Sequence, residues 1–317
     1  MNRIRRFYNQ NSRGIWIVGL IIILIFVVLK LIDYWTGERL KEENKLVNNT
    51  VQDIVTDNNI NLQTNKSAVT GESKSADSLN VEVQTIQTFL NNCTSGNIEE
   101  AYNMLTDECK EEMYNSVDDF YKFYCESTFK EKNMNFNVEN WINSIYKVMI
   151  DGDILATGKD NGDTSVQDYI TVRRVKDEYK LNINSYIRRD TLKKEKEDDN
   201  IKIEVINRDV YKDYESFDIK VKNNTGKDIL LDPKQDITSM YIEDSKSVQY
   251  SSYNHELTLA QLFLESGQEK EITIKYYSSY NSSKNIQKLV FSKVIIGFNR
   301  NNSYINGEKV SELNVSI

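Results

Sequence analysis

The sequence contains very little histidine and none of the short motifs that mark common enzyme classes. Its one histidine, His255, lies in Tyr-Asn-His-Glu-Leu, and no nucleophile motif accompanies it. There is no G-x-S-x-G, H-E-x-x-H, P-loop or G-x-G-x-x-G. We therefore expect a surface or capping role for His255, no catalytic or cofactor-binding residue, and a protein that is not an enzyme.

Cysteine is also scarce. The chain has three thiols, Cys93, Cys109 and Cys125, and an odd number leaves at least one unpaired in an oxidising compartment. There is no C-x-x-C and no neighbouring histidine, so the pattern does not favour a zinc or redox site. Buried apolar packing suits these residues. One disulfide among the three is the alternative that the sequence leaves open.

An excess of positive charge is missing as well. The formal net charge is -8 and the sequence pI is ≈ 5.1. Nucleic-acid-binding proteins present a basic face, so we expect no nucleic-acid partner. The length of 317 residues is enough for an anchor and two modest domains.

Long apolar runs are absent with one exception, which begins at Gly14 and carries no charge as far as Leu29. Extended to Ile32, it approaches the ~20 residues of a membrane-spanning helix. Four arginines and no acid precede it: Arg3, Arg5, Arg6 and Arg13. By the positive-inside rule, the sequence predicts a single-pass cell-membrane protein. Its cytoplasmic tail covers 1–13, its transmembrane helix covers 14–33 with Gly14 to Ile32 in the lipid bilayer, and its C-terminal domains are extracellular.

A cleaved signal peptide is the alternative for this run. Its apolar part would be about 7–15 residues long and would end in a small-x-small site. Here the run is longer and ends in Lys30-Leu-Ile-Asp-Tyr-Trp. A buried core helix fits less well, because the run has no polar face.

Residues 34–78 read as a stalk. Their composition changes to Asn, Thr, Ser, Asp, Lys and Glu, which leaves almost nothing to bury, so we expect a disordered linker. Leu40, Val47 and Ile54 are spaced by seven, so a short helix or coiled coil near the membrane stays open for the first half.

Residues 79–190 combine helical and strand periodicity. Apolar residues recur at helical spacing between Leu79 and Asn92, and Ser116-Val-Asp-Asp119 is typical of a capped helix start. The period then changes to two, and the predicted strands are Ser144–Ile150, Ile154–Thr157, Tyr169–Val175 and Tyr179–Ile183. Helices followed by an antiparallel meander predict an α+β domain.

A family resemblance appears in this domain. Phe89-Leu-Asn-Asn-Cys-Thr-Ser-Gly-Asn-Ile-Glu-Glu-Ala-Tyr-Asn-Met-Leu-Thr106, followed by Val117-Asp-Asp-Phe-Tyr-Lys-Phe-Tyr124, resembles the opening of an NTF2-like domain. The resemblance implies a cone of helices on a curved antiparallel sheet, which can hold a small ligand. Enzymes of that family resemble ketosteroid isomerase, with acids poised in an apolar pocket.

We expect no such buried acid in this chain. Five aspartates lie in predicted turns or at strand ends, where solvated roles are usual: Asp151, Asp153, Asp160, Asp163 and Asp168. Asp160-Asn-Gly-Asp163 lacks the alternating ligands and final Glu of an EF-hand, so no metal site is expected.

The rest of the chain alternates polar and apolar residues nearly throughout. Residues 191–199 form a charged connector, expected as a short exposed helix or loop, and residues 200–317 predict an all-β sandwich with a short helical crossover at Leu257 to Leu264. The patterns F-D-I-K-V-K-N-N-T-G-K-D-I and L-E-S-G-Q-E-K-E-I-T-I resemble immunoglobulin-like domains of bacterial surface proteins. Seven tyrosines suit either strand packing or an interface: Tyr241, Tyr250, Tyr253, Tyr276, Tyr277, Tyr280 and Tyr304.

Two hypotheses on function follow. In the first, a bitopic protein presents two non-catalytic domains outside the membrane for protein–protein interaction or scaffolding. That layout resembles accessory components of conjugative transfer and other envelope machines of Gram-positive bacteria, with other envelope proteins or further copies of itself as partners. In the second, the NTF2-like cone binds a small ligand or acts as an enzyme. A closed apolar interior favours the first, and an open pocket with a desolvated acid favours the second.

Overall fold

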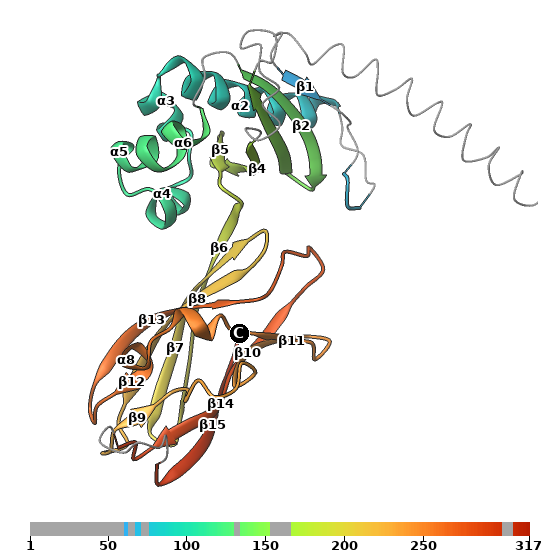
Figure 1. Ribbon diagram of the computed structural model, residues 1–317. Helices are drawn as coiled ribbons and strands as arrows, with labels where there is room; N and C mark the ends of the chain where they lie inside the picture. The colour runs from blue at the N-terminus through green and yellow to red at the C-terminus, as the bar shows by residue number, and fades with distance from the viewer. Residues whose placement is uncertain (1–59, 63–66, 71–75, 130–133, 153–165, 300–306) are drawn as a thin grey trace, which may run out of the picture. The chain divides into compact units, whose positions relative to one another are not determined.

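The computed structural model describes residues 60–62, 67–70, 76–129, 134–152, 166–299 and 307–317 (Figure 1). Residues 59–317 form one compact unit. The predicted cytoplasmic tail, the predicted membrane helix at 14–33 and most of the stalk lie outside the described residues. The predicted cellular location, the bilayer contact and the domain boundaries therefore stay predictions.

The predicted fold class is wrong. The described residues are 48% strand and 22% helix, so they are mainly β-sheet. Their longest helix, α2 (Ala76–Ser95), is amphipathic, with Val83 and Ile86 buried and Gln84 and Thr88 exposed. Among the described helices, none has both the length and the apolar character needed to cross a membrane. The described residues therefore do not support the prediction of a membrane protein with a transmembrane helix.

The first sheet has the strand order β1-β2-β3-β4-β5. Its strands are Ile60–Leu62, Met134–Ile142, Ile145–Gly152, Val166–Val175 and Glu178–Asn182. Strand β1 pairs parallel with β2, whereas the other neighbours pair antiparallel. The sheet is therefore mixed, and this corrects the wholly antiparallel sheet that the NTF2-like resemblance implied.

Short helices follow α2 before the chain enters β2. They are α3 (Ile98–Asn103), α4 (Asp107–Met113), α5 (Val117–Phe120), the π-helix η1 (Tyr121–Cys125) and α6 (Glu126–Thr128). The hydroxyls of Thr106 and Ser116 accept hydrogen bonds from the N–H groups of Cys109 and Asp119, which fixes the starts of α4 and α5. The start predicted at Ser116 is thereby confirmed.

The remaining strands form two further sheets. One has the order β13-β8-β7-β6, and the other has the order β11-β10-β14-β9-β12 with β15 paired to β14. Their bounds are β6 Tyr186–Asp198, β7 Ile201–Tyr211, β8 Glu215–Asn223, β9 Ile229–Leu230, β10 Met240–Asp244, β11 Gln249–Ser251, β12 Phe263–Leu264, β13 Glu269–Tyr276, β14 Ile286–Ile296 and β15 Lys309–Ser316. Side chains from both sheets, such as Phe217 and Phe291, share one buried core.

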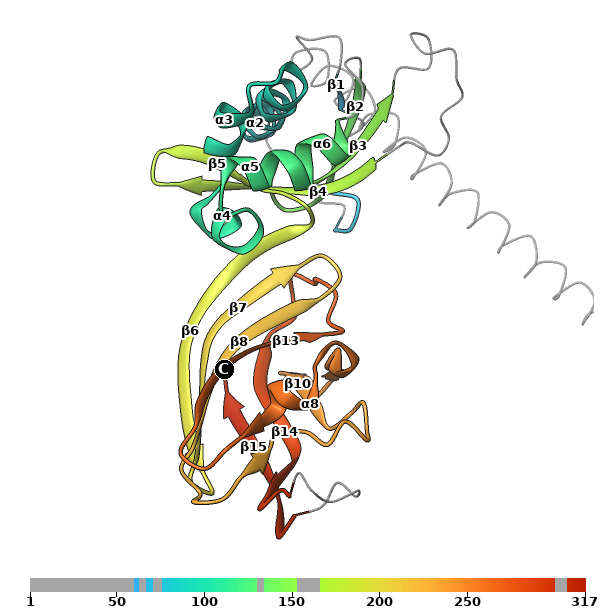
Figure 2. The same ribbon diagram turned by 60° about the vertical axis from the view of Figure 1, so that its left-hand side comes forward.

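Strand β6 corrects the local structure expected for the charged connector. Residues 191–198, expected as an exposed helix or loop, continue this strand, which runs beside β7 (Figure 2). The four-stranded sheet therefore includes the whole of Tyr186–Asp198. By contrast, the predicted crossover does contain a helix, α8 (Leu259–Leu262), which starts with a capping box of Thr258 and Gln261.

Candidate functional site

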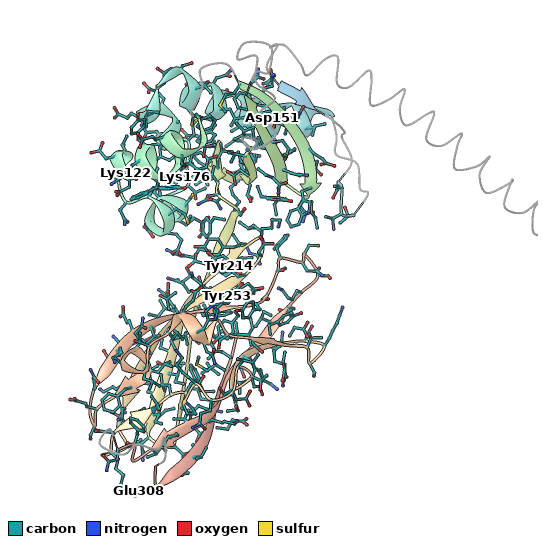
Figure 3. All side chains as sticks on the ribbon, in the orientation of Figure 1. Lys122, Asp151, Lys176, Tyr214, Tyr253 and Glu308 are labelled. Atoms are coloured by element: carbon teal, nitrogen blue, oxygen red, sulfur yellow. The ribbon has the colours of Figure 1, made fainter. Side chains whose placement is uncertain are left out.

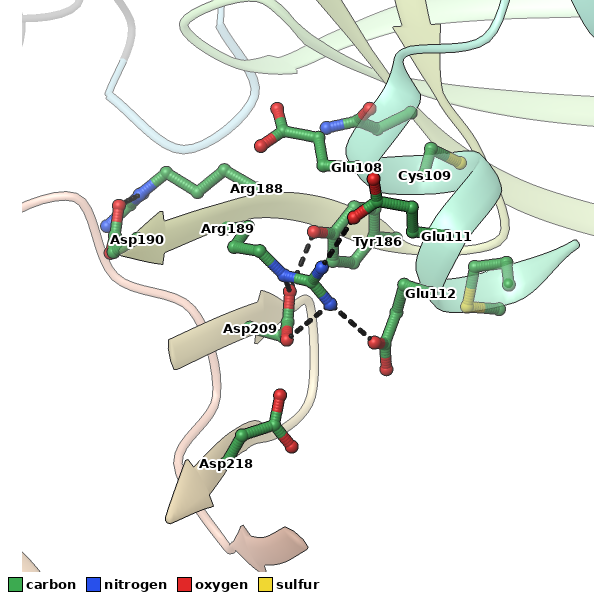
Figure 4. Close-up of polar contacts among 12 residues, drawn as sticks. Glu108, Cys109, Glu111, Glu112, Tyr186, Arg188, Arg189, Asp190, Asp209 and Asp218 are labelled. Atoms are coloured by element: carbon green, nitrogen blue, oxygen red, sulfur yellow. Dashed lines mark hydrogen bonds and ion pairs between the residues drawn. The ribbon is translucent and has the colours of Figure 1, made fainter. Parts of the chain in front are cut away.

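A cluster of charged side chains joins helix α4 to strands β6 and β7 (Figure 4). Arg189 of β6 lies directly opposite Asp209 of β7 in the sheet register. Its Nε donates to Asp209 Oδ1 at 2.9 Å, and its Nη2 donates to Asp209 Oδ2 at 3.0 Å. The same guanidinium reaches Glu112 Oε2 at 2.7 Å and Glu111 Oε2 at 3.2 Å. One arginine thus holds three carboxylates from two parts of the fold.

Two tyrosine hydroxyls complete this cluster. Tyr186 donates to Asp209 Oδ1 at 2.7 Å, and Tyr211 donates to Glu112 Oε1 at 2.6 Å. Burial raises the pKa of Glu112, and the hydrogen bond from Tyr211 partly offsets that effect. Burial acts to lower the pKa of Arg189, but the hydrogen bond and charge of Asp209, together with the charge of Glu112, outweigh it and the pKa is raised. The arginine uses four of its N–H groups here, so the cluster is a structural clasp with little capacity left for an anionic ligand.

A second, apolar contact supports the same junction. Ile142 and Ile145 of the first sheet pack with Ile187 of β6 and Val210 of β7. Trp141 lies against Tyr280, with ring centroids 5.9 Å apart. Tyr280, one of the predicted interface tyrosines, is therefore half-buried inside the molecule.

The structure corrects the prediction that Asp168 lies in a solvated turn. This β4 residue is 4% exposed, and its two oxygens accept four hydrogen bonds. The donors are the Tyr124 hydroxyl at 2.8 Å and the backbone N–H groups of Tyr169, Asn184 and Ser185 at 2.6, 3.0 and 3.0 Å. Burial raises the pKa of Asp168, while the backbone N–H of Asn184 and the Tyr124 hydroxyl act to lower it.

This aspartate has a clear structural task. Asn184 and Ser185 have φ values of 56° and 63°, and they form the turn that leads the chain from β5 into β6. A carboxylate that accepts both of their N–H groups stabilises this left-handed turn, which L-residues adopt only at a cost. Asp168 thereby orients the strand that carries Arg189.

Sequence reasoning missed a second buried acid, Glu82. It is 6% exposed and accepts hydrogen bonds from Ser144 at 3.0 Å and from the Tyr146 hydroxyl at 2.5 Å. Its position could have been predicted, because Glu82 falls three residues after Leu79 and four before Ile86, on the buried face of α2. Burial, together with the charge of Glu82, raises the pKa of Tyr146.

Aromatic rings fill the space between the helices and the first sheet. Phe89, Phe120 and Tyr124 lie with ring centroids 5.6 to 6.2 Å apart, and Phe120 is fully buried. A shallow surface depression of about 290 Å³ lies instead over α4, and its lining includes Tyr102, Asp107 and Lys110. Neither Asp168 nor Glu82 lines this depression.

Three tyrosine rings lie next to one another in the second part of the chain, and Figure 3 labels two of them, Tyr214 and Tyr253. Tyr253 and Tyr277 are stacked with centroids 3.6 Å apart, and Tyr277 is 50% exposed. Tyr214 lies 6.2 Å from Tyr253 and is stacked on Tyr211 at 4.2 Å. The Lys275 ammonium lies over the Tyr214 ring at 5.5 Å. We call Tyr214, Tyr253 and Tyr277 the tyrosine row.

The other residues singled out from the sequence fall into clear groups. His255 is exposed beside Tyr253, as predicted. Tyr276 is buried, and Tyr241 and Tyr250 are half-buried. Asp151 is half-buried near Asn137, with 3.5 Å between its Oδ2 and the amide nitrogen. Asp153, Asp160, Asp163 and Tyr304 lie outside the described residues. All three cysteines are buried thiols.

Comparisons with known proteins add no family. No protein-family model and no curated protein matches the chain. A conserved hypothetical protein from Bacillus anthracis, solved by crystallography, matches 38% of this chain and 96% of its own length, at 13% identity and a TM-score of 0.24. A similarity of this size carries no argument about fold or function.

Proposed function

We propose that this chain is a non-catalytic protein whose role is to bind another protein, in the manner of a scaffold component. The observation that carries the proposal is the tyrosine row. Its outermost ring, Tyr277, is half exposed, yet stacking on Tyr253 already orders it. Tyrosine provides large contact area and a polar hydroxyl, and a side chain ordered before binding loses less entropy when a partner docks.

The surroundings of the row suit a protein partner. Lys275 lies over Tyr214 and also pairs with Glu256 at 3.1 Å, so charges of both signs border the rings. Interfaces between proteins commonly combine an aromatic centre with such a polar rim. The backbone beneath is fixed, because Tyr253 N–H donates to the Lys275 carbonyl and Tyr277 N–H donates to the Ser251 carbonyl.

Site-directed photocrosslinking in the cells that naturally make this protein tests the proposal. A benzophenone amino acid replaces Tyr277 in one variant and Tyr179, a 37% exposed tyrosine of β5, in the control. We expect one crosslinked protein of defined mass with the probe at 277, and at least about tenfold less of it with the probe at 179. Monomer alone at 277, or the same products at both positions, would contradict the proposal.

A ligand-binding or enzymatic role for the helical part of the chain is a second candidate, and one observation favours it. Burial raises the pKa of Asp168, as expected for an acid in a ligand pocket. Its oxygens are occupied by four donors, however, and Tyr124 packs against it. Soaking the protein with a fragment library while observing the Asn184 amide by NMR tests this role, and a saturable shift there would support it over the scaffold.

A further inference from the structure

Two thiols meet between helix α2 and the π-helix η1. Cys93 lies in the last turn of α2, two residues before its end, and Cys125 is the last residue of η1. Their sulfur atoms are 3.9 Å apart, and the two residues are 5% and 3% exposed. We propose that Cys93 and Cys125 are a redox-active pair that closes to a disulfide when it meets a disulfide oxidant, while Cys109 stays a thiol.

The distance between the two sulfurs makes this pairing accessible. A disulfide has an S–S length of ~2.05 Å, so each sulfur needs to move by roughly 1 Å, which small side-chain rotations supply. The local structure of α2 and η1 also favours the approach of the two sulfur atoms. Helix α2 ends at Ser95, before Gly96 with its φ of 81°, and η1 is a π-helical segment, in which the usual register is already interrupted.

Cys109 lacks such a partner in the described residues. It lies on α4, where its backbone N–H donates to the Thr106 hydroxyl at 3.0 Å, and its thiol is hydrogen-bonded with the Ile183 backbone. Burial raises the pKa of Cys109 to about 12. The structure thus selects one pairing of the three that the sequence allows.

The oxidant is a small disulfide, R–S–S–R. One cysteine thiolate attacks it, forms a mixed disulfide and releases the first RS⁻. The second cysteine thiolate then attacks the protein sulfur of that mixed disulfide and releases the second RS⁻. Two protein thiols lose two electrons to R–S–S–R, their two protons end on the released thiols, and one Cys93–Cys125 disulfide remains.

Burial sets the rate of this reaction. Because both thiols are nearly inaccessible, and because burial raises the pKa of Cys93, closure needs a brief opening of α2 from η1. The product ties two elements separated by 32 residues of sequence. A crosslink across a loop of that length restricts the unfolded chain, and we expect Tm to rise by roughly 5–10 °C.

The test incubates the full chain with glutathione disulfide at about pH 8.5, close to the ordinary thiol pKa. The chain is then unfolded in acid, its free thiols are alkylated, and its peptides are mapped by mass spectrometry. We expect one alkylated cysteine, Cys109, and a linked peptide containing Cys93 and Cys125. The variant Cys109→Ser is expected to close and gain Tm like the wild type.

Two variants identify the pair directly. Cys93→Ser and Cys125→Ser are expected to form no intramolecular disulfide and to gain no Tm with the oxidant. The proposal is overturned if the wild type keeps three alkylatable thiols after incubation with glutathione disulfide. It is also overturned if a crosslink includes Cys109. If the disulfide between Cys93 and Cys125 forms but lowers Tm, the expectation that this crosslink stabilises the fold is wrong.

Discussion

Arg189 and Asp209 face each other on neighbouring strands and are joined by two parallel hydrogen bonds of 2.9 and 3.0 Å. Fork-to-fork geometry of this kind is the strongest arrangement that an arginine makes with a carboxylate. Because the same guanidinium also binds Glu111 and Glu112 of α4, one side chain ties the helical part of the molecule to the β6–β7 hairpin.

Replacing Arg189 should therefore weaken the whole unit. We expect Arg189→Ala to reduce the free energy of unfolding by about 3–5 kcal/mol, because it leaves the buried Asp209 carboxylate without its countercharge. Arg189→Lys should lose less, since an ammonium keeps the charge but cannot make the paired contact. Equilibrium urea unfolding measures both.

Arg174→Ala is the matched control for this prediction. Arg174 is 66% exposed and its only described ion pair, with Asp177, is 3.7 Å long, so its loss should change the free energy of unfolding by less than about 0.5 kcal/mol. Equal losses in Arg189→Ala and Arg174→Ala would show that the clasp contributes nothing beyond a surface charge.

The turn held by Asp168 gives the second prediction. In Asp168→Asn, the amide can keep one accepting oxygen but presents N–H groups where the Asn184 N–H now donates. The partly buried Asn184 N–H then loses its hydrogen bond to a charged acceptor, at a cost of about 1 kcal/mol. Hydrogen exchange at the Asn184 amide should accelerate relative to the wild type. Asp151→Asn, at a half-buried site, should leave exchange at Asn184 unchanged.

Local patterns in the sequence were sufficient for several elements. The apolar spacing after Leu79 predicted α2, and Ser116 predicted the start of α5 because its hydroxyl is a good N-cap. The exposed position of His255 also agrees with the surface role expected from the absence of a nucleophile motif. These features depend on residues close in sequence, so periodicity and capping rules are enough to predict them.

The clasp and the sheets depend instead on residues far apart. Arg189 lies in a charged stretch that looks solvated, and it is paired only because β7 and α4 pack on β6. Likewise, nothing local to Asp168 indicates that a turn sixteen residues later needs its oxygens. The fold class was mispredicted for the same reason: strand pairing decides that the stretch after Tyr186 extends a sheet, and pairing is not visible in one segment.

The raised pKa of Glu112 predicts a pH dependence. A group whose pKa is higher in the folded than in the unfolded chain adds stability that is complete below its unfolded value, ~4.3, and that is lost as the pH rises through its folded value. Glu112→Gln cannot titrate. The free energy of unfolding of the wild type should therefore fall relative to that of Glu112→Gln as the pH rises from about 4 to 7. Urea unfolding at several pH values measures both proteins. A wild type that becomes more stable relative to Glu112→Gln over this range would contradict the direction of the pKa shift.

A buried charge network around Glu215 supplies the last prediction. Glu215 is fully buried and is bonded by Arg208 Nε at 2.7 Å, Lys284 Nζ at 2.8 Å and Ser278 Oγ at 3.0 Å. Glu215→Leu leaves the two buried cations without their shared carboxylate, so we expect a loss of about 3–5 kcal/mol. Lys284→Met should cost less, since Arg208 still neutralises Glu215.

The double variant Glu215→Leu/Lys284→Met separates pairing from packing. Removing the ammonium as well relieves one of the two uncompensated cations, so the double variant should be at least about 1 kcal/mol more stable than the sum of the single losses predicts. Arg208 would still face Asp190, 3.8 Å from its Nη1. Strict additivity in a double-mutant cycle by urea unfolding would mean that Glu215 and Lys284 do not stabilise each other, and that Glu215 acts through Arg208 alone.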